Sequence, residues 1–536
     1  MRARVVLAGL AAALAACSEA GTPLATLPSD APRLSLRAGR VSVAQYSAYV
    51  SNGDWRPAIE KAMTDAGTVV FPAGATYTLK STVSVLDGTR FVGEGATSVI
   101  SVDGAVRAAF VGVGSAADFK EDVTVDSLAF AGTGAQQQVA LSIVNGRRIK
   151  FRWNNLTKIG LIETDVADRA TATKSTLTSD VEVTGNHGDG MRQLFPPASP
   201  ALWGVYFNYT DSTTVSDNTL HNYLIGIQWW GGDAKHERIP NAQNPEGKNM
   251  PHGLPTFAED MTITGNTVTN TEAGIWGSMG RNIKVSKNRV EVCVDVCLDA
   301  EGGSNIHFQE NRAYNAGQTV LGVYDYAKDI LFDWNEVIQD GRYWPEYGAW
   351  PAHYGETLFA SYNVEQRPEQ ISIRLQNNWF HYTGGSGVGR IWKSASDYFL
   401  LANSGAMNKV VVDMLGNNNG YVEITGNPID LGNRSTGSLP AIAVGRNHNE
   451  SAWIGGNTIT STVAQSAPAI YAYQDQWYTT LTTNLDRNTI TGFSNAVKVE
   501  AHNSSHTFGI YNTTTTGGFQ KVGTAVAVGS GNPWPL

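Results

Sequence analysis

An asparagine recurs at the end of short apolar segments along most of the chain, and its spacing limits the fold more than any other feature. In the central part, Asn266, Asn288, Asn311 and Asn335 lie 22, 23 and 24 residues apart. The residues before each asparagine alternate between apolar and polar, which is the period of a β-strand. A fixed period of about 20–50 residues marks a repeat protein. The same pattern ends at Asn186, Asn218, Asn378, Asn427, Asn457 and Asn488.

The pattern favours one kind of β-solenoid. Asparagine suits the turn after a strand because its amide bonds turn backbone and because it tolerates the left-handed conformation. Stacked turns also let each asparagine bond its neighbours and form a ladder. Leucine-rich repeats need a leucine spacing that is absent here, and a propeller blade needs about 40 residues. We therefore expect an all-β chain folded as a right-handed parallel β-helix.

Composition excludes several other classes of protein. Only 16% of residues are charged, against about 25% in an average domain, which argues against a disordered chain or a coiled coil. The net charge of −9 argues against a nucleic-acid partner, since nucleic-acid binding needs a basic surface. The 14 Trp and 20 Tyr residues are many for so polar a chain and suggest aromatic binding surfaces.

The first residues predict export. Residues 1–16 combine a basic start with an apolar run of about a dozen residues, which is typical of a signal peptide and too short to span a membrane. The end of this run, Leu14-Ala-Ala-Cys17, resembles the lipobox of bacterial lipoproteins. That resemblance implies a lipid on Cys17 that holds the protein on a membrane, and Ser18 favours the outer membrane. Residues 17–40 read as a tether, and residues 41–536 as a single β-helix domain.

The start of this domain carries a second resemblance. Residues 54–66 predict a short capping helix with Asp54 as its N-cap. Together with residues 67–74 and 91–95, they resemble the entry segment of pectate-lyase-like β-helix proteins, a superfamily that includes rhamnogalacturonases, epimerase-like proteins and phage tailspike depolymerases. The resemblance implies the fold and an action on carbohydrate. The polygalacturonase signature is not present, and Arg148-Ile-Lys150 occurs too early to be part of it.

Aligning the central repeats backwards from the residue that opens each following strand, namely Asn282, Asn305 and Asp329, gives two columns of outward side chains. The first column contains Gln228, Trp276, Asp299 and Val323, and the second contains Trp230, Ser278, Glu301 and Asp325. Rungs of a parallel sheet lie about 4.8 Å apart, so Glu301 and Asp325 are expected to stack directly, with Asp299 about 6.7 Å along the strand from Glu301. Like charges stacked on a sheet are destabilising, so three carboxylates there suggest a function.

Two long insertions, at residues 233–260 and 341–356, flank these columns. Long loops on a rigid solenoid usually form a binding wall. Flat apolar rings such as Trp230 and Trp276 suit the apolar faces of sugars. The expected substrate-binding residues are Trp230, Trp276, Lys235, Arg238, Arg342, Tyr343 and His353.

The carboxylate columns predict a glycoside hydrolase that acts on a polysaccharide with Asp299, Glu301 and Asp325 as its acid and base groups. A uronate lyase or epimerase is the alternative, with the acids holding Ca²⁺ and a basic residue or tyrosine removing the proton. A non-catalytic glycan-binding or structural lipoprotein is the third reading. No motif for a nucleotide cofactor and no zinc spacing is present, so no cofactor beyond Ca²⁺ is expected.

Cys293 and Cys297 remain open between free thiols and a disulfide. Four residues along a straight strand would separate them by about 13 Å, so a disulfide requires a turn between them.

Overall fold

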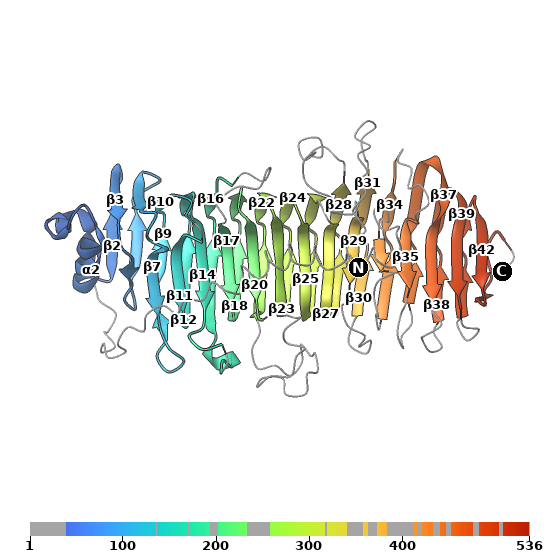
Figure 1. Ribbon diagram of the computed structural model, residues 1–536, viewed down its shortest axis with the longest axis horizontal. Helices are drawn as coiled ribbons and strands as arrows, with labels where there is room; N and C mark the ends of the chain where they lie inside the picture. The colour runs from blue at the N-terminus through green and yellow to red at the C-terminus, as the bar shows by residue number, and fades with distance from the viewer. Residues whose placement is uncertain are drawn as a thin grey trace, which may run out of the picture.

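A computed structural model describes residues 39–135, 137–169, 171–192, 202–232, 258–316, 319–339, 357–362, 372–382, 412–414, 421–432, 440–445, 452–474, 482–502 and 507–534. The described strands form a long rod in which successive turns of chain stack along one axis (Figure 1). Every pairing between these strands is parallel, and each strand pairs with one in the next turn. The predicted parallel β-helix is therefore confirmed.

The strands fall into three ladders, here called sheets A, B and C, which the chain visits in that order in each turn. Sheet A contains β4 (Val83–Ser84), β7 (Ala108–Val113), β11 (Val139–Val144), β14 (Gly160–Asp165), β17 (Trp203–Asn208), β20 (Ile225–Trp230), β29 (Thr357–Tyr362), β32 (Val412–Met414), β35 (Ile442–Gly445) and β42 (Gly518–Gly523).

Sheet B begins at the N-terminal end of the rod. It contains β1 (Arg40–Ser42), β2 (Thr68–Phe71), β5 (Arg90–Gly93), β8 (Lys120–Glu121), β9 (Thr124–Asp126), β12 (Gly146–Arg152), β15 (Thr178–Thr184), β18 (Thr210–Ser216), β21 (Ala258–Thr264), β30 (Ser372–Gln376), β33 (Tyr421–Thr425), β36 (Ala452–Gly455), β38 (Thr482–Asp486), β40 (Thr507–Tyr511) and β43 (Val526–Val528).

Sheet C consists mainly of shorter strands. It contains β3 (Ala75–Leu79), β6 (Ser98–Val102), β10 (Ala129–Ala131), β13 (Asn155–Thr157), β16 (His187–Asp189), β19 (Thr219–His221), β22 (Thr267–Thr271), β24 (Arg289–Cys293), β26 (Arg312–Ala316), β28 (Glu336–Gln339), β31 (Trp379–Tyr382), β34 (Pro428–Asp430) and β41 (Thr514–Thr515).

Five longer strands bend through a corner and belong to two sheets. Three of them join sheet A to sheet B, namely β23 (Ala273–Ser286), β25 (Val296–Gln309) and β27 (Thr319–Asp333). The other two join sheet C to sheet A, namely β37 (Thr458–Gln474) and β39 (Thr489–Ala501).

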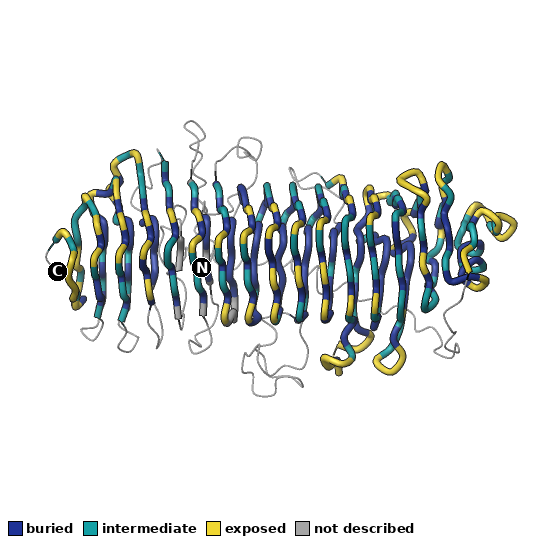
Figure 2. Tube along the Cα trace, turned by 180° about the vertical axis from the view of Figure 1, so that it is seen from behind, coloured by how far each residue is buried: buried dark blue, intermediate teal, exposed yellow. Residues whose placement is uncertain are grey.

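The core runs through the rod as one continuous apolar cluster, from Val43 to Ala525. Inward positions stack like on like, as for Phe308 and Phe332, whose ring centroids are 4.5 Å apart. Seen from behind, buried and more exposed positions alternate along many strands (Figure 2). This alternation is the sequence period that predicted the strands.

Helix α2 (Arg56–Asp65) closes the N-terminal end of the rod (Figure 1) and follows a short 3₁₀ segment, η1 (Val43–Tyr49). It buries Ile59 and Met63 on the core, as the capping helix was expected to do. The predicted N-cap was wrong, because Trp55 occupies that position. Asp54 lies one residue earlier, where its Oδ1 accepts hydrogen bonds from the backbone N–H groups of Arg56 and Lys80. The aspartate therefore joins the helix to the first turns of the rod.

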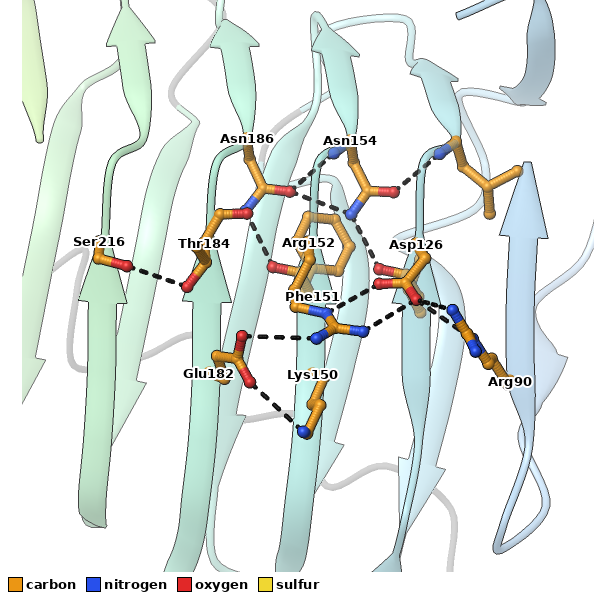
Figure 3. A network of polar contacts seen from close by, with 12 residues as sticks. Arg90, Asp126, Lys150, Phe151, Arg152, Asn154, Glu182, Thr184, Asn186 and Ser216 are labelled. Carbon is orange, nitrogen blue, oxygen red and sulfur yellow. Dashed lines mark hydrogen bonds and ion pairs between the residues drawn. The ribbon is translucent and has the colours of Figure 1, made fainter. Parts of the chain in front are cut away.

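The asparagine ladder forms as predicted and begins one turn earlier, at Asn154. Each ladder Nδ2 donates to the Oδ1 of the next asparagine, from Asn154 to Asn186 and onward to Asn488. Figure 3 shows the first of these steps beside Arg152, which lies between Asp126 and Glu182 on the outer face of sheet B.

One detail of the turn differs from expectation. The left-handed residue is the one before the ladder asparagine, as at Lys287 with φ 57° and Glu310 with φ 54°. Glycine takes this position at Gly185 and Gly265. The asparagine is therefore required for its hydrogen bonds and not for its backbone conformation.

Candidate active site on sheet A

The register of sheet A brings together most of the two predicted columns. Trp276 pairs with Gln228, and Ser278 pairs with Trp230 on one side and Glu301 on the other. Leu298 pairs with Ile275, which places Asp299 beside Trp276. The predicted alignment is therefore confirmed for the three rungs that contain residues 228, 276 and 299.

The fourth rung was misaligned, and Asp325 does not stack on Glu301. Asp299 pairs with Gly322 and Glu301 pairs with Tyr324, after which the register shifts so that Gly303 pairs with Ala327. Asp325 falls inside this β-bulge, and its side chain lies outside the described residues. This repeat is one residue longer than the repeat before it, and the extra residue forms the bulge. A count backwards from Asp329 crosses the bulge and therefore misplaces the residues before it by one position.

Asp299 and Glu301 lie on the outer face of β25. The residues between and beside them, Leu298 and Ala300, are fully buried in the core. Asp299 is only 3% exposed, whereas Glu301 is partly exposed. The two carboxyl groups therefore have unequal contact with solvent.

Gly322 makes room for the Asp299 carboxylate on the neighbouring rung. A Cβ atom at Gly322 would lie 3.0 Å from Asp299 Oδ1 and 2.6 Å from the ring of Tyr324. The missing side chain lets the carboxylate and the tyrosine ring share the surface over β27. This contact could not be read from the misaligned column, which had placed Val323 there.

An aromatic cluster adjoins the carboxylates on the same face. Ile225, Ala273 and Trp276 form a buried group apart from the main core, with Trp203, Leu224 and Trp230 packed against it. The rings of Trp230 and Trp276 meet edge to face, with centroids 6.3 Å apart. Trp276 is 6% exposed and Trp230 is more exposed, so Trp230 presents the more accessible ring. Trp229 points inward and is fully buried.

Five other predicted binding residues lie outside the described residues, as do most of both insertions and the lipidation position Cys17. These five are Lys235, Arg238, Arg342, Tyr343 and His353.

The structure brings together two groups of titratable residues that the sequence did not predict as groups, although Asp295 stood out as a further outward carboxylate. The first lies at the turn that leads into sheet A, where Arg192 Nη2 is 3.0 Å from Glu272 Oε2 and the Asp295 backbone N–H donates to the Glu272 carbonyl. Burial, with the charge of Glu272 beside it, raises the pKa of Asp295 to about 7. Glu272 and Asp295 are one repeat of 23 residues apart, so the spacing alone would have paired them.

The second group lies on the outer face of sheet B, where Asp211 pairs in register with Glu259 and Glu259 with Arg281. The insertion at residues 233–260 separates Asp211 from Glu259 by 48 positions and hid this stack from the repeat count. Glu259 Oε2 accepts a hydrogen bond from Arg281, and Lys174 Nζ lies 2.5 Å from Asp260 Oδ2.

Within the described ranges, no cluster of three or more His, Cys, Asp or Glu side chains could hold a metal ion. In that same part of the chain, no helix is long and apolar enough to cross a membrane. Cys293 and Cys297 are free thiols and are buried. A turn lies between them, as a disulfide would require, and their Sγ atoms are 2.7 Å apart.

Comparison with known proteins agrees with this architecture. Residues 203–358 match a family model described as a right-handed β-helix region. No curated protein matches the chain in sequence.

Solved structures of similar shape are parallel β-helix proteins. The tailspike of E. coli bacteriophage HK620, solved as a double mutant in complex with a pentasaccharide, has a TM-score of 0.53 at 10% identity over 90% of this chain and 78% of that one. The A-module of the mannuronan C-5 epimerase AlgE6 from Azotobacter vinelandii has a TM-score of 0.44 at 12% identity, over 91% and 99%. The DFA-IIIase of Arthrobacter chlorophenolicus A6 has a TM-score of 0.41 at 12% identity, over 85% and 98%. At these low sequence identities, the similarity shows only that the folds are alike.

Proposed function

We propose that the chain is a polysaccharide-active enzyme, and specifically a glycoside hydrolase, whose active site is the outer face of sheet A around Asp299 and Glu301. The supporting observation is the placement of two carboxyl groups on one strand directly beside the Trp230–Trp276 cluster. A rigid sheet holds the carboxyl groups, and the rings offer an apolar surface to a sugar. The pentasaccharide complex of the structurally similar tailspike agrees with this proposal.

The spacing of the two groups favours an inverting reaction. The backbone positions of residues two apart on a strand lie about 6.7 Å apart. Parallel side chains at that spacing would hold their carboxyl groups near the range of about 6.5–9.5 Å that leaves space for a water molecule between acid and base. Glu301 is the more exposed group and is placed to activate this water. Asp299 is more enclosed, beside Trp276 and Tyr324, and is placed to protonate the leaving oxygen. A stacked Glu301–Asp325 pair, with its carboxyl groups about 5 Å apart, would have favoured a retaining reaction. Asp325 lies in the bulge and does not pair with Glu301, so this alternative loses its support.

An activity screen tests this proposal. Purified protein is incubated with neutral and with uronic-acid polysaccharides, and new reducing ends are measured together with the ultraviolet absorbance of unsaturated products. Hydrolysis predicts reducing ends without ultraviolet gain, and a fall of about 100-fold or more in Asp299→Asn and Glu301→Gln. Glu310→Gln is the matched control, since Glu310 lies in the exposed turn at the end of the same β25 rung.

Other outcomes would replace the proposal. Ultraviolet gain that chelator abolishes would make the protein a lyase and would favour a metal-binding role for the carboxylates. An unchanged rate in both variants would move the active site elsewhere.

We also propose that the protein is an exported lipoprotein of the outer membrane, on the basis of residues 1–17. Cell fractionation tests this, with the protein expected in the membrane fraction and Cys17→Ser expected in the soluble fraction. Equal distribution of both forms would contradict the lipid anchor.

A further inference from the structure

An open depression of the surface, here called the cavity, lies around the corner from sheet A, on the outer face of sheet B. It has a volume of about 670 Å³, and its lining includes Arg147, Lys174, Ser175, Ser179 and Asp211. Its size is that of a small-ligand site. Its lining mixes cationic groups, hydroxyl groups and carboxyl groups, which suits the donors and acceptors of a sugar.

Three of the lining residues, Arg147, Ser179 and Asp211, belong to one column of the parallel ladder. Arg147 pairs with Ser179, Ser179 with Asp211, and Asp211 with Glu259, on consecutive strands β12, β15, β18 and β21. Side chains of such a column stack about 4.8 Å apart on one face. The fixed ladder therefore sets the spacing of the guanidinium, the hydroxyl and the carboxyl groups.

The wall is the segment that contains the 3₁₀ turn η2 (Lys174–Thr176), and it is held from two sides. Val166, Ala172 and Leu177 pack on Tyr209 in a small apolar cluster that also contacts Trp230. The carbonyl of Ser175 accepts a hydrogen bond of 2.9 Å from Arg147 Nη2. Contact with Trp230 joins this wall to the candidate active site.

Asp211 contributes a largely buried carboxyl group to the lining. The residue is 8% exposed, and its Oδ1 has no hydrogen-bond partner among the described residues. Lys174 Nζ is 3.8 Å away, beyond hydrogen-bond distance, and is closer to Asp260. The Asp211 side chain is 12% exposed, so its carboxyl group can accept a hydrogen bond from a ligand hydroxyl.

Arg147 can provide a positive charge to a ligand in the cavity. Its guanidinium lies over the ring of Phe119, 3.5 Å from the centroid, and no carboxylate of the described residues is within ion-pair distance. The adjacent Arg148, by contrast, is bonded to Glu121 and Asp122. A stacked guanidinium is already oriented for the two parallel hydrogen bonds that a carboxylate or sulfate accepts.

We propose that this cavity binds a sugar unit that carries a carboxylate or sulfate group. Arg147 binds the anionic group, and the Asp211 carboxyl group accepts a hydroxyl hydrogen bond from the same ligand. The inference rests on the proposed function, because it makes the cavity a second binding site for the polysaccharide whose cleavage is assigned to sheet A.

Calorimetric titration of the full chain tests the proposal. The Asp299→Asn variant is used so that no probe is consumed. The carboxylate probes are tetragalacturonate and tetramannuronate, the sulfate probe is a κ-carrageenan tetrasaccharide, and cellotetraose is the neutral probe. At least one anionic probe is expected to bind, more weakly at high salt, with cellotetraose at least tenfold weaker.

Variants assign the binding to this cavity. Arg147→Gln, added to the Asp299→Asn variant, is expected to weaken binding of the anionic probe by about tenfold or more. Arg147→Lys keeps the positive charge, so its affinity should lie between those of the Arg147 protein and the glutamine variant. Arg312→Gln is the control, since Arg312 also lies over an aromatic ring, that of Tyr314, but on sheet C and with Glu336 as its partner. Melting temperatures confirm that each variant is folded.

The outcomes separate the two proposals. Binding that depends on Arg147, with no turnover of any polysaccharide, would keep this site and overturn the hydrolase. Turnover that depends on Asp299, with anionic probes that do not bind or that bind equally to Arg147→Gln, would overturn this site alone. Equal affinity for cellotetraose would overturn the anionic specificity.

Discussion

Hydrogen bonds of single side chains hold neighbouring turns of the rod together. The Oδ1 of Asn288 accepts from the backbone N–H and the Nδ2 of Asn266, and its Nδ2 donates to the Ile263 carbonyl and to Asn311 Oδ1. All of these groups are buried. Each ladder residue thus satisfies donors and acceptors in three turns of chain, which explains why the residue type recurs.

Replacing one ladder residue leaves several of these groups without partners. Asn288→Ala is expected to lower the free energy of unfolding by about 3–5 kcal/mol, since each buried unsatisfied group costs about 1–3 kcal/mol. Chemical denaturation measures this change. Asn155→Ala, at an exposed strand position, is the control and should change stability by about 0.5 kcal/mol or less. Similar losses in both variants would contradict a stabilising ladder.

Gly322 controls the geometry of the candidate catalytic carboxyl group without contributing a side chain. Gly322→Ala places a methyl group against Asp299 Oδ1 and the Tyr324 ring, so it is expected to reduce turnover by about tenfold or more through misplacement of Asp299. Steady-state kinetics with circular dichroism measures both activity and fold. The control is Gly518→Ala at the distant end of sheet A, where the nearest atoms are 3.5 Å and 3.7 Å away. Full activity in Gly322→Ala would contradict a role for Asp299.

At the scale of elements, the turn between β24 and β25 concentrates two kinds of chemistry. Asp295 lies there next to Glu272, whose own pKa is raised by burial and which Arg192 faces. Cys293 and Cys297 flank the same turn. The turn therefore places a carboxyl group with a high pKa at the entrance of sheet A.

The raised pKa of Asp295 has a defined effect on stability. The folded state holds the proton up to about pH 7, whereas an unfolded aspartate loses it near pH 4. Folding is therefore favoured less as the pH rises from about 4 to about 7. The Asp295→Asn variant does not lose stability in this way. Its melting temperature minus that of the wild type should therefore be larger at pH 8 than at pH 5. A difference that is constant with pH, measured by calorimetry, would contradict the assignment.

The two thiols at this turn are close enough to be joined. A disulfide bond is about 2.0 Å long, and the Sγ atoms are 2.7 Å apart. Mild oxidation is expected to remove both free thiols and to stabilise the fold by about 2 kcal/mol, a small gain because the closed loop is short. Thiol titration of denatured Cys17→Ser protein, before and after reduction, measures this. Two free thiols after oxidation would show that the turn does not permit the bond.

Local irregularities limited what could be predicted from the sequence at this scale. The asparagine period identified the strands and placed Asp299, Glu301, Trp230 and Trp276 on one face, because rungs of equal length keep their register. One extra residue in β27 moved Asp325 out of line, since repeat counting cannot locate a bulge. The stack of Asp211 on Glu259 stayed hidden because an insertion interrupts the count between them.

At the scale of the whole molecule, the rod is a linear scaffold whose candidate sites lie on two of its outer faces. Sheet A carries the carboxyl groups and tryptophans, and sheet B carries the cavity with Arg147 and Asp211. The wall of that cavity packs on Trp230, so the two faces meet at one corner of the rod. An extended polymer that lies across this corner would contact both.

The most direct test of the central claim is a crystal structure of the Asp299→Asn, Glu301→Gln double variant with an oligosaccharide of the polysaccharide that the wild type turns over. The account predicts sugar density on the outer face of sheet A, with a ring against Trp230 and a glycosidic oxygen within hydrogen-bond distance of residue 299. Sugar bound only on another face of the rod would contradict the assignment of the active site.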